Sequence, residues 1–146
     1  MGFIINSRIL SFKKMLGLPS PTVICARLPI VEKAIAEHRL HPVKINLQLA
    51  KTLFGKSETE ITTSITNMVI GLLLKNKPVY LSDFEMLFDP RYKLDLIKLL
   101  CEISRHNRLF VEWPGKFSNG SLTYAEPGYD DFAKYKVSDY EIVCVV

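Results

Sequence analysis

Two acidic residues at the end of a short apolar run are the strongest chemical signal in the sequence. The run Val79 to Leu81 leads directly into Ser82 and Asp83, and Glu85 follows two positions later. This pattern is typical of a buried parallel strand that delivers an acid to the carboxyl edge of an α/β sheet. In nucleotide-binding proteins with a phosphate loop, an acid at this position lies beside the Mg²⁺ of the nucleotide.

If Mg-ATP binds, Asp83 is therefore the expected metal-associated acid, and Glu85 is expected to orient the attacking water. A spacing of two residues places both side chains on one face, provided that the strand continues. The alternative interpretation is structural, with Asp83 capping a turn and Glu85 paired with an arginine such as Arg105. The choice depends on whether the chain also has a phosphate-binding loop.

The triplet Gly55-Lys56-Ser57 is one candidate for that loop, because it fits a relaxed Walker A pattern that starts at Ala50. A phosphate loop wraps its ligand with successive backbone N–H groups and favours small residues, whereas residues 51–54 are bulky helical sequence. The other interpretation is that Gly55 ends one helix and Ser57 caps the next, with Glu60 completing a capping box. Lys56 and Ser57 are cofactor ligands only if the first interpretation holds.

The turn after the first predicted strand is the second candidate, because doubly wound domains place their phosphates there. It reads Ala26-Arg27-Leu28-Pro29 and contains neither glycine nor lysine. Arg27 is its one side chain suited to an anion. A standard phosphate loop is not expected from this segment.

Arg105 and Arg108 follow a strongly apolar helical segment and form the other notable cluster. Cations at a helix C-terminus are favourable in themselves, and the functional alternative is contact with a neighbour's nucleotide or with nucleic-acid phosphates. The net charge of +4 is compatible with an anionic partner without requiring one. No zinc site is predicted, and the three cysteines are expected to be reduced core thiols.

Strand and helix patterns alternate along the chain as in an α/β domain with a mainly parallel sheet. We expect one domain, with an amphipathic helix over residues 1–18, and no segment that suits a signal peptide or a membrane span. Helices are predicted over residues 29–39, 47–54, 58–75 and 94–105, and five strands over residues 22–26, 43–47, 79–81, 109–113 and 141–146. Asn119-Gly120 predicts a hairpin near the C-terminus, where aromatic residues gather either as core or as a partner interface.

Four blocks of sequence, in order, resemble the small P-loop-containing protein of type III BREX bacteriophage-defence systems (BrxF). The resemblance covers roughly residues 20–146. The blocks are Asp83-Phe-Glu85-Met-Leu-Phe88-Asp89-Pro90, Leu99-Leu100-Cys-Glu-Ile-Ser104-Arg105, Trp113-Pro-Gly115 and Leu122-Thr-Tyr-Ala-Glu-Pro-Gly128.

This resemblance implies a cytoplasmic protein with a three-layer, RecA-like P-loop NTPase-type domain, a five-stranded sheet and a C-terminal hairpin. It also implies that the protein acts together with a larger ATPase, a DNA methyltransferase, a helicase and a phosphatase-like protein. No contact with a membrane is expected. The chain departs from the family at Ala26-Arg27-Leu28-Pro29, where a Gly-Lys-Ser/Thr loop would be expected. We therefore expect an accessory subunit with an assembly or regulatory role. The alternatives are a protein that binds or hydrolyses ATP with Mg²⁺, acting alone or with a partner ATPase, and a DNA-binding module. Self-association into a homo-oligomer is left open.

Overall fold

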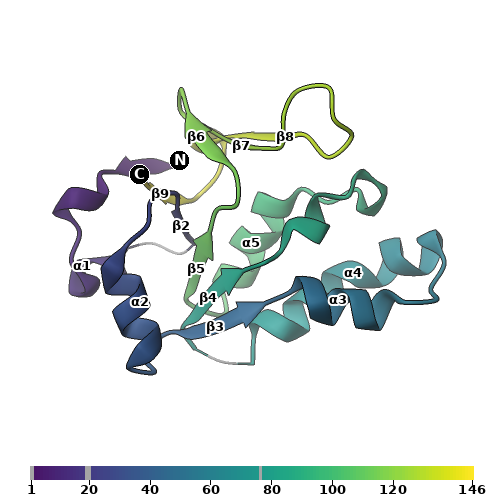
Figure 1. Ribbon diagram of the computed structural model, residues 1–146, viewed down its shortest axis with the longest axis horizontal. Coiled ribbons are helices and arrows are strands. Elements are labelled where there is room, and N and C mark those ends of the chain that lie inside the picture. Colours follow the sequence, from purple (N-terminus) through teal and green to yellow (C-terminus); the bar gives the residue numbers. More distant parts are fainter. Residues whose placement is uncertain (1, 19–20, 76) are drawn as a thin grey trace.

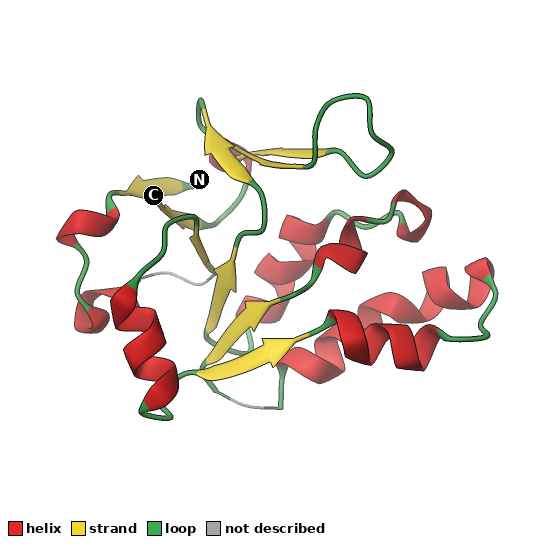
Figure 2. Cartoon of the chain, viewed as in Figure 1, coloured by secondary structure: helices red, strands yellow, loops and turns green. Residues whose placement is uncertain are grey.

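A six-stranded parallel sheet organises the chain, as the computed structural model shows for residues 2–18, 21–75 and 77–146 (Figures 1 and 2). Its strand order is β1-β9-β2-β5-β4-β3. The strands are β1 (Phe3–Ile5), β2 (Thr22–Ile24), β3 (His41–Lys44), β4 (Val79–Ser82), β5 (Leu109–Glu112) and β9 (Val143–Val145). Each pair of neighbouring strands in this sheet is parallel, so all carboxyl ends lie at one edge.

Helices cover both faces of this sheet because its side chains alternate between two apolar cores. One core joins Val79 and Leu81 to α3 (Asn46–Leu53), α4 (Glu58–Leu73) and α5 (Leu96–Ser104). The other joins Ile24 and Phe110 to α1 (Phe12–Leu16) and α2 (Pro29–Ala36). Figure 1 shows α1 and α2 on one side of the strands and α3, α4 and α5 on the other. The arrangement is a three-layer α/β fold.

A small antiparallel sheet lies beyond the carboxyl edge of the parallel one. It contains β6 (Lys116–Ser118), β7 (Ser121–Tyr124) and β8 (Ala133–Lys136), in that order. Asn119 and Gly120 both adopt positive φ between β6 and β7, as two-residue hairpin turns require. The predicted hairpin is thus confirmed, and β8 extends it to three strands.

The expected count of five strands is wrong, because β1 adds a sixth beside β9. Residues that were expected to form one amphipathic helix instead form β1, the 3₁₀ turn η1 (Ser7–Ile9) and the short helix α1. The side chains of Asn6 and Ser11 accept hydrogen bonds from the backbone N–H groups of Arg8 and Lys14, and so start η1 and α1 separately. Met1, Pro19, Ser20 and Asn76 lie outside the described residues.

The remaining predicted strands and helices are confirmed, with ends that differ by a few residues. Short 3₁₀ turns that were not predicted follow β4 and precede β9: η2 (Glu85–Phe88), η3 (Pro90–Tyr92) and η4 (Val137–Asp139). Within the described ranges, no helix combines the length and the apolar character that crossing a membrane would need.

Candidate functional site at the carboxyl edge of the sheet

A groove of about 690 Å³ opens where four neighbouring strands end. Its lining includes the last residue of each of β2, β3, β4 and β5, namely Ile24, Lys44, Ser82 and Glu112. The turn between β2 and α2 and the first residues of α2 form its other wall. A crevice outside the carboxyl ends of parallel strands is the usual ligand site of open α/β sheets, and this volume is typical of such sites.

The turn between β2 and α2 occupies the position where a phosphate loop would lie. Pro29 is the first residue of α2 and has no N–H to offer a ligand. The N–H groups of Val31 and Glu32 donate to the Leu28 carbonyl, at 3.0 and 3.4 Å. Arg27 donates from Nε to the Glu32 carboxylate at 2.9 Å. The helix start thus carries an acid, which forms a solvent-exposed ion pair with the nearby Arg27.

A second acid lies across the groove. This acid is Glu112, and burial of the Tyr80 hydroxyl together with the neighbouring Glu112 charge raises the pKa of Tyr80. Lys44 is exposed on the same lining, whereas Ser82 is buried. The lining thus carries two carboxylates and two cations, Arg27 and Lys44, and offers a polyanionic ligand no net positive charge.

Asp83 and Glu85 do not share a strand face, contrary to the expectation from their spacing. The strand β4 ends at Ser82, and Asp83 adopts a left-handed φ of 48°. The backbone carbonyl of Asp83 accepts hydrogen bonds from the N–H groups of Ile45 and Asn46, at 3.1 and 2.7 Å. Asp83 therefore lies in a turn that anchors the start of α3, with its side chain exposed.

Asn46 is the main partner of Glu85, and sequence reasoning missed it. Its Nδ2 donates to Glu85 Oε2 at 2.6 Å, and its Oδ1 accepts from the N–H of Met86 at 3.0 Å. The alternative in which Glu85 pairs with an arginine such as Arg105 is thus wrong. An asparagine at the first position of a helix was the available signal. The partners lie 39 and 40 residues away, however, so periodicity could not identify them.

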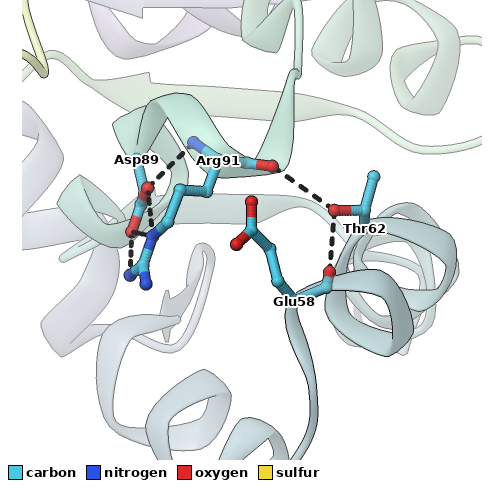
Figure 3. Close-up of polar contacts among 4 residues, drawn as sticks. All are labelled: Glu58, Thr62, Asp89 and Arg91. Carbon is cyan, nitrogen blue, oxygen red and sulfur yellow. Dashed lines mark hydrogen bonds and ion pairs between the residues drawn. The ribbon is translucent and has the colours of Figure 1, made fainter.

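A second hollow, of about 510 Å³, lies between η3 and the loop that joins β7 to β8. It is lined by Glu85, Asp89, Pro90, Arg91, Tyr129, Asp130 and Asp131. Arg91 donates to both oxygens of Asp89, which lowers the pKa of that carboxyl (Figure 3). The Thr62 hydroxyl bridges the carbonyls of Glu58 and Arg91, and so attaches η3 to α4. These bonds hold the turn in place on the helix.

Gly55, Lys56 and Ser57 lie in the connection between α3 and α4, at the end of the molecule away from α2 (Figure 1). Gly55 has a φ of 78°, as a residue after a helix often has. Ser57 Oγ accepts from the N–H of Glu60 at 3.2 Å and donates to its carboxylate at 3.1 Å. Ser57 is therefore confirmed as the cap of α4, although the Glu60 carboxylate accepts from the Ser57 hydroxyl and not from the backbone N–H that a capping box uses. The structure does not bring this triplet together with Arg27 or Asp83.

Replacing Ser57 with alanine is expected to lower the free energy of unfolding by about 1 kcal/mol, because the N-cap bond of α4 is lost. Lys56→Ala is the matched control, and its effect should stay within about 0.5 kcal/mol because the side chain is exposed. Urea unfolding followed by circular dichroism measures both. Equal losses in the two variants would be inconsistent with the cap.

Arg105 and Arg108 lie at the opposite, amino edge of the sheet, between α5 and β5. Arg105 is exposed, whereas the half-buried Arg108 donates from Nη2 to the Met15 carbonyl and to Thr22 Oγ1, at 2.9 and 3.0 Å. The guanidinium also lies 4.3 Å from the centre of the Phe110 ring, and burial lowers the pKa of Arg108 to about 10. These contacts give Arg108 a packing role between α1 and the sheet.

The aromatic residues of the last third form a continuous cluster with those that follow β4. Phe88 stacks on Tyr124 with centroids 4.0 Å apart and meets Trp113 edge-on at 5.6 Å. Phe84 lies 6.4 Å from Trp113, and Tyr135 lies 6.1 Å from it. The Trp113 indole N–H donates to the Thr123 carbonyl at 3.0 Å. This cluster, Phe84, Phe88, Trp113, Tyr124 and Tyr135, fastens the small sheet to the large one.

The predicted site residues therefore do not converge. Arg27 lines the groove, Glu85 lines the second hollow beside η3, and Asp83 lines neither of them. Among the residues that the structure describes, no three His, Cys, Asp or Glu side chains are arranged to hold a metal ion. The groove's turn, with Pro29 and the Arg27–Glu32 pair, does not fit the phosphates of Mg-ATP.

Comparisons of the chain with protein-family models, with curated proteins and with solved structures found no match.

Proposed function

We propose that this chain is an accessory subunit of a BREX-type phage-defence system, in which a P-loop-like domain serves assembly rather than ATP hydrolysis. The observation that carries the proposal is the turn between β2 and α2. An acid paired with Arg27 and a proline stand there in place of a phosphate cradle. The domain thus combines a layout compatible with RecA-like proteins and a site unsuited to their ligand.

The blocks that carry the family resemblance support this proposal through packing. Phe84 and Phe88 from the first block contact Trp113 and Tyr124 from the third and fourth. Leu99, Leu100 and Ile103 of the second block belong to the same core. The blocks thus contain residues that hold the two sheets together, which a protein that uses the fold without the chemistry also needs.

An exposed apolar stripe along α3 and its C-cap residue supports an assembly role, which we propose is carried out in the cytoplasm beside the other defence proteins. Leu47, Ala50 and Phe54 lie three and four residues apart on one side of the helix region. Phe54 is 89% exposed and Leu47 is 66% exposed. Large apolar side chains that share an exposed face often mark interaction sites.

Reconstitution with the larger ATPase of the same system tests the proposal. We expect a complex in analytical ultracentrifugation both with and without Mg-ATP, and Phe54→Ser should weaken it at least tenfold. Gln48→Ser, an exposed polar change on the same helix, is the matched control and should leave the affinity unchanged. Absence of association with the ATPase, methyltransferase, helicase and phosphatase-like protein alike would refute an assembly role.

A further inference from the structure

The outward face of the small antiparallel sheet carries three lysines in two neighbouring rows. Lys116 of β6, Thr123 of β7 and Lys134 of β8 lie opposite one another. Two residues along, Ser118, Ser121 and Lys136 form a second row. Side chains two residues apart on a strand point to the same side, so both rows belong to one face.

The intervening rows show that this face points away from the core. Phe117, Leu122 and Tyr135 form one such row, and all three pack in the main core. Tyr124 and Ala133, which are paired, pack there too. The three lysines are exposed, as expected for the opposite side, although Ser121 between them is buried.

Positive charge on this face is largely uncompensated. Lys116 lies 3.4 Å from Glu126, but both side chains are exposed, and such pairs contribute little to stability. Neither Lys134 nor Lys136 has an ion-pair partner within the described ranges. Strand geometry separates Lys134 from Lys136 by about 7 Å and Lys116 from Lys134 by about 9.5 Å.

We propose that this lysine face, Lys116, Thr123, Lys134, Ser118 and Lys136, binds the phosphate backbone of duplex DNA. Lysines act as point charges for phosphates, and serine and threonine hydroxyls are common backbone contacts. The face has no aromatic, amide or arginine side chain to read base edges, so binding is independent of sequence. It also has no large apolar side chain to enter a bilayer, which favours nucleic acid over a membrane surface. The proposal does not depend on the proposed function.

Fluorescence anisotropy with a labelled duplex of mixed sequence tests this inference between 50 and 200 mM NaCl. Neutralising three phosphates gives a slope of log affinity against log salt of about −2.7. The variant in which Lys116, Lys134 and Lys136 are changed to glutamine should bind at least tenfold more weakly at low salt, with a slope near zero. Changing the same three to arginine should restore binding and shows that the face still folds.

The matched control changes Lys51, Lys56 and Lys75 to glutamine, which removes the same charge from exposed positions around α3 and α4. We expect this control to keep the affinity and the slope of the original chain. The proposal is overturned if the control loses as much binding as the lysine-face variant, or if the unchanged chain shows no DNA binding at 50 mM NaCl. Tighter binding to vesicles of anionic lipid than to DNA would overturn it as well.

Discussion

Phe84→Ala should lower the free energy of unfolding by about 3–5 kcal/mol, the largest loss that we expect from one substitution. The Phe84 side chain is fully buried and contacts both Phe88 and Trp113 at the junction of the two sheets. Its removal leaves a cavity that this rigid junction can fill only in part. Trp113 is the only tryptophan, so its fluorescence during urea unfolding reports on the same cluster.

Tyr129→Ala is the matched control, because this aromatic side chain is 68% exposed and should change stability by no more than about 0.5 kcal/mol. Phe84→Leu keeps much of the side-chain volume and should cost about 1–2 kcal/mol, which allows a measurement if the alanine variant fails to fold. A loss below about 1 kcal/mol in Phe84→Ala would show that the aromatic cluster does not hold the junction.

Asn46→Ala is expected to lower stability by about 1–3 kcal/mol, because two hydrogen bonds are lost, one of them to the charged Glu85. The second of these bonds comes from the N–H of Met86, which is then left without its partner in a half-buried position. Urea unfolding measures this loss, and Gln48→Ala on the exposed side of the same helix is the control.

A double-mutant cycle with Glu85→Ala separates this bond from other effects of each change. We expect a coupling energy of about 0.5–3 kcal/mol, as for residues in direct contact. Additive effects within about 0.3 kcal/mol would show that Asn46 and Glu85 act independently.

The alternating pattern of the chain was sufficient to predict the layers and five of the six parallel strands, because buried strands and amphipathic helices leave clear periodicities. The strand β1 was missed because it has only three residues, and two of them, Phe3 and Ile4, are exposed at the sheet edge. A short strand of this kind lacks alternation. Its partner β9 lies about 140 residues away, and local sequence cannot identify such a partner.

The candidate site was harder to predict than the fold. Ser57 and Glu60 lie three residues apart, so the N-cap of α4 could be recognised locally. The left-handed turn at Asp83 and the bridge from Asn46 to Glu85 depend on contacts between segments about 40 residues apart. The lysine face depends on strand register, and no short segment of sequence displays it.

Calorimetric titration of Mg-ATP into the purified chain tests most directly whether the turn between β2 and α2 lacks a phosphate site. Because Pro29 has no N–H to offer and Glu32 is paired with Arg27, we predict no binding heat up to about 1 mM nucleotide. Asp83→Ala should behave in the same way. Micromolar binding that disappears in Asp83→Ala would contradict this interpretation and would identify a working nucleotide site at the carboxyl edge of β4.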